Sequence, residues 1–115
     1  MTHPPIEAKG QTGTITFDGT LITIRRTGFV ARMIVGKGTK EFRLANLAAV
    51  QFKPAGPIIS GYIAFTLPGG VEVKSRPGRA TYDAANDENS VMFTQKQMPA
   101  FTALRDAVQA ALREL

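Results

Sequence analysis

The chain has 115 residues and a formal net charge of +5, and it contains one His, no Cys and no Trp. A chain of this length is expected to form one domain with its own hydrophobic core. Without Cys it can form no disulfide, thiolate nucleophile or thiolate metal site, and the lone His3 excludes a multi-histidine metal site within one chain.

The positive charge is distributed unevenly. Residues 1–79 contain 11 Lys or Arg and 4 Asp or Glu, which gives +7, whereas residues 80–115 contain 3 and 5, which gives −2. The first residues lack the pattern of a signal peptide, and no run of about 18 apolar residues is present. We therefore expect a cytoplasmic protein, and the lack of Cys agrees with a reducing compartment.

The N-terminal residues 1–9, in which His3 precedes Pro4 and Pro5, are predicted to form a mobile arm before a single domain at 10–115. Residues 14–24 carry the clearest local pattern. Two alternating runs rich in β-branched residues flank Asp18-Gly19, a dipeptide that tolerates the positive φ angles of a tight turn. The pattern predicts a β-hairpin with one apolar face and one polar face.

Short strands are also predicted farther along the chain, separated by Gly- and Pro-containing breaks. Their ranges are 29–35, 41–44, 49–53, 61–67, 71–74 and 90–94. A helical turn is expected at 45–47, a break at 54–57, and an irregular polar segment at 75–89.

The C-terminal segment changes to a helical period. From Met98 to Leu115 apolar residues recur at spacings of three and four, and Pro99 suits the first turn because its missing N–H has no intrahelical partner there. The apolar stripe favours a helix that covers its own sheet, although a partner helix or a membrane surface is an alternative. The whole pattern predicts a mainly β, α+β fold: about seven antiparallel strands in two packed sheets or a partly open barrel, capped by one helix.

Several segments taken in order carry a family resemblance. They are residues 13–19, 24–29, 35–38, 51–57, 61–63 and 82–93, with Ala107 in the helix. Together they resemble an actinobacterial family with a pleckstrin-homology-like (PH-like) fold and unknown function. The resemblance spans residues 10–112 and implies that fold and an actinobacterial or actinophage origin, but no ligand and no site residue. Members often carry a short additional C-terminal module, which is not expected here because the chain ends at Leu115 after the helix.

The candidate binding residues are basic and lie in two regions, on and after the hairpin and in a Gly/Pro-containing loop. They are Arg25, Arg26, Lys37, Lys74, Arg76 and Arg79. Guanidinium groups bind phosphate or carboxylate with two parallel hydrogen bonds, so these residues are candidates for an anion or an acidic partner. The alternative for the loop is a solvated segment whose arginines pair with the acidic run at 83–88.

No arrangement of residues in the sequence indicates catalysis, and we predict that the chain is not an enzyme. The acidic run lacks the alternating ligand spacing of a Ca²⁺ loop, so we expect no metal and no cofactor. We predict a non-catalytic binding or scaffold domain that engages a protein partner or itself through a sheet edge or the basic loops. The alternative is an anion-binding module for lipid headgroups or nucleic acid, whose binding would fall steeply with salt. No small-molecule substrate is expected.

Overall fold

The structure is a computed structural model that describes residues 5–26, 39–68 and 89–115. Within these ranges it contains seven strands, one short 3-10 helix and one α-helix. The elements are β1 (Ile6–Lys9), β2 (Gly13–Phe17), β3 (Leu21–Arg26), β4 (Thr39–Arg43), η1 (Leu44–Asn46), β5 (Ala49–Lys53), β6 (Gly61–Thr66), β7 (Ser90–Phe93) and α3 (Met98–Arg113).

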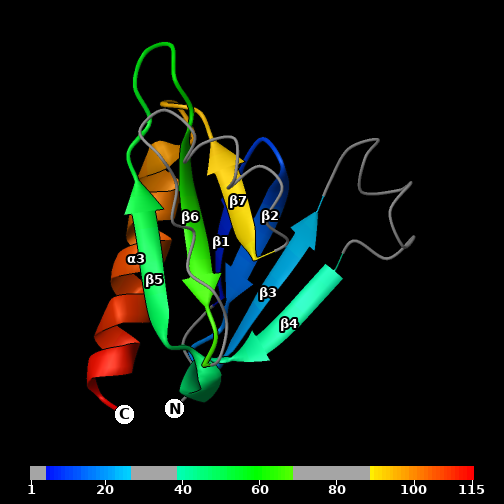
Figure 1. The fold of residues 1–115 in the computed structure, drawn as a ribbon, viewed down its shortest axis with the longest axis vertical. Helices are drawn as coiled ribbons and strands as arrows, with labels where there is room; N and C mark the ends of the chain where they lie inside the picture. Colours follow the sequence, from blue (N-terminus) through cyan, green and yellow to red (C-terminus); the bar gives the residue numbers. More distant parts are fainter. Residues whose placement is uncertain (1–4, 27–38, 69–88) are drawn as a thin grey trace.

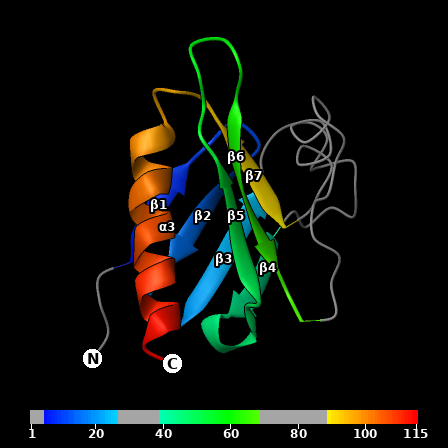
Figure 2. The same ribbon diagram turned by 60° about the vertical axis from the view of Figure 1, so that its left-hand side comes forward.

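The strands form two antiparallel sheets, one with the order β1-β2-β3-β4 and one with the order β5-β6-β7. Helix α3 lies along one side of the pair and packs against β1, η1, β5 and β6 (Figure 2). No ladder joins the two sheets among the described strands, so these strands do not close into a barrel. The predicted mainly β fold, with two packed sheets and a C-terminal helix, is confirmed (Figure 1).

The core lies between the two sheets and α3, because each contributes an apolar face. In the first sheet the register aligns Ile6, Phe17, Ile22 and Phe42 in one inward row. In α3, Phe101, Leu104 and Val108 recur at helical spacing and are fully buried, whereas Leu115 at the end of the predicted stripe is exposed. The largest fully buried apolar side chains are Ile15, Ile22, Ile24, Ile63, Val91, Phe93, Phe101, Leu104 and Val108. The apolar residues that alternate along the strands and those that recur at helical spacing in α3 therefore pack into one core.

The predicted hairpin at 14–24 is confirmed as β2 and β3. Gly19 has a φ of 103°, which a residue with a side chain rarely adopts. The Asp18 carboxylate accepts hydrogen bonds from the Thr20 and Leu21 N–H groups at 2.8 and 2.7 Å. Asp18 thus fixes the turn through its side chain, as Asp does in Asx-turns.

Replacing Asp18 with Asn tests the charge of this turn. The N–H groups of Leu21 and then Thr20 hold the pKa of Asp18 below its ordinary value of 3.8. A carboxyl whose pKa is depressed on folding contributes stability above the unfolded-state pKa, and that contribution is lost as the pH falls through the folded-state pKa. Asn keeps an acceptor oxygen but carries no charge. We expect Asp18→Asn to unfold at a lower urea concentration than the wild type at neutral pH and by a smaller margin at about pH 2. An equal gap at both pH values would show that the charge has no role.

One predicted boundary was wrong. Residues 6–9, assigned from the sequence to a mobile arm, form strand β1, which pairs with β2 in the register Ile6↔Phe17 to Lys9↔Thr14. Ala8 is fully buried, and its strand packs against α3. A strand of four residues with a small inward side chain shows only a weak alternation of apolar and polar residues. The helix that covers β1 also stabilises its position. The domain therefore begins no later than Ile6.

The remaining predicted elements agree to within two residues where the structure describes them. The strand expected at 41–44 is β4, the helical turn at 45–47 is η1, and the strands at 49–53, 61–67 and 90–94 are β5, β6 and β7. Helix α3 begins at Met98 with Pro99 in its first turn and ends at Arg113. The predicted strands at 29–35 and 71–74, and the irregular segment except for its last residue, lie outside the described residues.

Candidate binding surfaces

The basic candidates Arg25 and Arg26 lie at the end of β3, on opposite faces of the first sheet because they are adjacent in a strand. Arg25 is exposed on the outer face. Arg26 is half-buried, and its Nη1 donates a hydrogen bond to the Ser90 carbonyl oxygen at 3.4 Å. Arg26 therefore connects β3 to β7, and the structure does not bring the two arginines together as one anion site. The other four candidates, Lys37, Lys74, Arg76 and Arg79, lie outside the described residues.

The outer face of the first sheet carries most of its charges in two neighbouring rows, and Arg43, paired with Leu21, lies in the row beyond them. The register aligns Glu7, Thr16, Thr23 and Glu41 in one row and Lys9, Thr14, Arg25 and Thr39 in the next. We call these eight residues the striped face. The first row has a carboxylate at each end, and the second row carries two cations. Glu7 and Lys9, at 3.8 Å, form an ion pair between the rows.

The sheet has two edge strands, β1 and β4, and β4 pairs with β3 alone among the described strands. Its sequence Thr39–Arg43 carries three charged residues, and Glu41 and Arg43 are exposed. Charged side chains on an edge strand oppose the addition of a further strand. The charged residues of β4 therefore disfavour the addition of a further strand at this edge.

The loop between β5 and β6 carries exposed apolar side chains. Ile58 is 94% exposed and Ile59 61% exposed. We call Pro57, Ile58 and Ile59 the apolar tip, because the loop extends beyond the ends of β5 and β6 (Figures 1 and 2). A hydrogen bond from the Gly56 N–H to the Ile59 carbonyl oxygen, at 2.8 Å, closes the loop just below its apex.

Two further contacts hold the base of this loop to the rest of the domain. The Ala55 N–H donates to Met98 Sδ at 3.3 Å, at the start of α3. The Ser60 hydroxyl donates to Gln11 Oε1 at 2.6 Å, in the β1–β2 turn. Pro54 and Pro57 each fix one φ angle within the same loop. The apolar tip is thus presented on an anchored loop whose ends contact two other elements.

Lysines accompany the apolar tip at this end of the molecule. Lys53 ends β5 immediately before the loop, and Lys96 lies exposed in the turn between β7 and α3. The β2–β3 turn, which contains Asp18, lies at the opposite end (Figure 1). The two isoleucines therefore share their end of the domain with positive charge.

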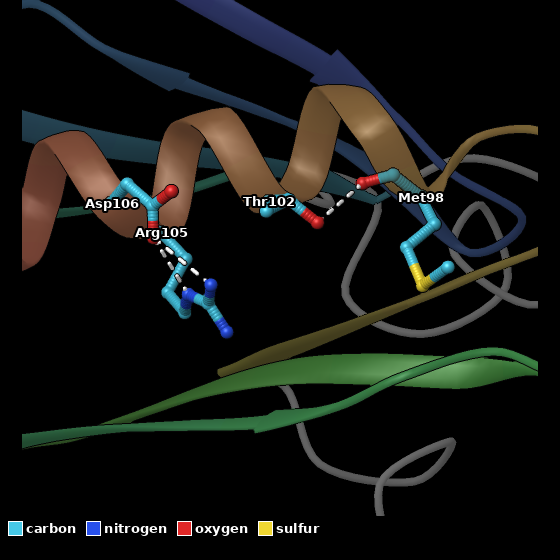
Figure 3. Close-up of polar contacts among 4 residues, drawn as sticks. All are labelled: Met98, Thr102, Arg105 and Asp106. Carbon is cyan, nitrogen blue, oxygen red and sulfur yellow. Dashed lines mark hydrogen bonds and ion pairs between the residues drawn. The ribbon is translucent and has the colours of Figure 1, made fainter.

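Two polar side chains of α3, those of Thr102 and Arg105, make contacts within the domain. Arg105 contacts Asp106 through Nε and Nη2, at 3.1 and 2.9 Å, and its guanidinium lies 4.4 Å from the centre of the Phe52 ring. The Thr102 hydroxyl donates to the Met98 carbonyl oxygen at 3.1 Å (Figure 3). Arg105 therefore joins the helix to β5 by a cation–π contact and is not a candidate ligand.

In the described ranges, no group of three or more His, Asp or Glu side chains is placed to hold a metal ion. No helix in them is both long and apolar enough to cross a membrane.

A protein-family model matches residues 15–109, which include most of β2, all of β3 to β7 and most of α3. Its description is a domain of unknown function, DUF4429. The chain belongs to the DUF4429 family. Comparisons with curated proteins and with solved structures give no match. The DUF4429 match contains the apolar tip and all six basic candidates and begins after β1, so part of the striped face lies outside it.

The apolar tip of this DUF4429 domain was not predicted as a binding surface from the sequence, in which residues 54–57 were interpreted as a break between two strands. The sequence nevertheless contains an indication of the tip. Ile58 and Ile59 follow Pro57, outside any alternating run, and large apolar residues in a turn have no core face to occupy. Their exposure depends on how far the loop extends, which the local sequence does not determine.

Proposed function

We propose that this DUF4429 domain is a non-catalytic binding domain with a PH-like fold that docks onto a protein partner through its apolar tip. The order of elements supports the PH-like assignment: a meander of four strands, a second sheet of three strands, and a C-terminal helix packed across the pair. The proposal includes the actinobacterial or actinophage origin that the sequence resemblance implies.

The observation that carries the docking role is the exposure of Ile58 at 94% on an anchored loop. Burying one isoleucine side chain on binding contributes about 1.5–3 kcal/mol. A loop tied down at both ends loses little conformational entropy when it binds, so most of that contribution appears as affinity. Exposed apolar side chains of this kind mark protein contacts when they are presented in a fixed geometry.

Replacing both Ile58 and Ile59 with Ser tests the role of the tip. The loss of about 3 kcal/mol of apolar burial is expected to weaken partner binding about a hundredfold. The control is Leu115→Ser, because Leu115 is also exposed, at 74%, but lies at the end of the chain. Immobilised wild type and control are expected to retain the same proteins from an actinobacterial lysate, and the tip variant is expected to lose them. A partner purified from that set then gives the dissociation constants directly.

Two outcomes would contradict the protein-docking proposal. Identical capture by the tip variant and the wild type would remove the tip from the binding surface. Tip-dependent binding to anionic lipid vesicles, abolished by salt, would favour the anion-binding alternative, because Lys53 and Lys96 lie at the same end of the domain as the tip.

A further inference from the structure

The striped face is a second exposed surface, and the apolar tip does not belong to it. It covers the outer side of β1 to β4, and its eight residues are charged or are threonines. Glu7, Lys9, Arg25 and Glu41 are exposed, and the three threonines of β2 and β3 are half-exposed between them. A sheet face with charges in ordered rows is suited to the same face of a second copy.

The two rows of the striped face are complementary to each other. One row ends in Glu7 and Glu41, and the other contains Lys9 and Arg25. Successive residues on one face of a strand are about 6.6–7 Å apart, so the rows are separated by about that distance. A two-fold axis that runs across the strands, midway between the rows, therefore places the acidic row of one copy over the basic row of another.

This symmetry brings opposite charges together at both sides of the face. Glu7 of one copy lies opposite Lys9 of the other, and each Glu41 lies one strand away from Arg25 of the other copy. The threonines of β2 and β3 fill the centre, where their methyl groups pack. A two-fold axis parallel to the strands would instead place each row over its own copy and bring like charges together. The charge pattern therefore selects one orientation and disfavours the other.

We propose that the striped face is a self-association surface, on which a second copy of this chain docks about a two-fold axis that runs across the strands. Four strands about 4.8 Å apart and about five residues long cover about 20 by 17 Å. That area is small beside the ~800 Å² per partner of a stable interface, so the dimer is weak and depends on concentration.

The experiment uses a reciprocal charge exchange, with sedimentation velocity and light scattering over a range of concentrations up to the solubility limit. The wild type is expected to change from monomer to dimer across this range. Arg25→Glu alone and Glu41→Arg alone are each expected to raise the dissociation constant about tenfold, because two symmetry-related contacts change from attraction to repulsion. An equimolar mixture of the two variants is expected to restore dimerisation, because opposite charges again meet at both positions.

The matched control is Arg113→Glu, which makes the same charge change on α3, away from the striped face. It is expected to dimerise like the wild type. A wild type that stays monomeric, a control that weakens association as much as Arg25→Glu, or a mixture that stays monomeric would overturn the proposal. The tip variant Ile58→Ser, Ile59→Ser is expected to dimerise normally. Its failure to dimerise would assign self-association to the tip instead, so failure of this proposal and failure of the docking role are distinguishable.

Discussion

Replacing Phe101 with Ala is expected to lower the free energy of unfolding by about 3–5 kcal/mol. Phe101 is fully buried in α3, and its ring stacks on Phe93 with 4.6 Å between centroids. The truncation removes the aromatic contact and leaves a cavity between the helix and both sheets, because the helix backbone cannot collapse into it. Since a domain of this size is stable by only about 5–15 kcal/mol, the variant is expected to be close to unfolding.

Urea unfolding monitored by circular dichroism measures this loss. Phe101→Leu, which keeps most of the volume, is expected to lose clearly less than Phe101→Ala. Leu115→Ala is the surface control and is expected to change the free energy of unfolding by less than about 0.5 kcal/mol. If Phe101→Ala cost no more than Leu115→Ala, the helix would not be seated on the sheets as the structure shows.

The elements that depend on local chemistry were predictable from the sequence. Asp18-Gly19 between two alternating runs defines its hairpin without help from the rest of the chain. The spacing of Phe101, Leu104 and Val108 defines the buried stripe of α3 in the same way. The strand β1 was missed because Ala8 is a weak strand signal, and its pairing with β2 and the helix packed against it keep it in place.

The candidate surfaces were less predictable, because they depend on relations between strands. Adjacent residues of a strand point to opposite faces, so Arg25 and Arg26 separate once β3 extends to residue 26. The striped face requires the register of four strands, and a shift of one residue in any strand would move its charges to the inner face. The partner of Arg26, the Ser90 carbonyl oxygen, lies 64 residues away along the chain.

The apolar tip and the striped face lie on different parts of the domain, so both could bind at the same time. The apolar tip projects from the end where β5 and β6 join, whereas the striped face covers the side formed by β1 to β4 (Figures 1 and 2). A pair of copies joined by the striped face would therefore leave both tips uncovered. Two tips on one dimer raise the effective concentration of the second contact once the first has formed, which compensates for weak binding at a single tip.

Gly61→Ala is expected to have the second large effect on the free energy of unfolding. Gly61 lies at the base of the loop that carries the apolar tip. Gly61 is the first residue of β6, and a Cβ atom at this position would collide with the Lys53 carbonyl oxygen and lie 2.6 Å from the Ala55 nitrogen. These are backbone atoms at the base of the loop, so no side-chain rotation relieves the overlap. Forcing a methyl group into such a space is expected to lower the free energy of unfolding by about 2–3 kcal/mol.

Gly56→Ala is the matched control, because it makes the same substitution in the same loop. Among the described residues, a Cβ atom there meets only the Ile59 carbonyl oxygen at 4.0 Å, an ordinary van der Waals distance. Gly56→Ala is expected to leave the unfolding free energy within about 1 kcal/mol of the wild type, or to raise it slightly by restricting the unfolded chain. Thermal and urea unfolding of the three proteins measures both effects.

Since Gly61 lies where the loop rejoins the sheet, Gly61→Ala is also expected to weaken tip-dependent capture, whereas Gly56→Ala keeps it. Equal stability of the two variants would show that β6 does not pass as close to the end of β5 as the structure indicates, and the tip would then lack its anchored base.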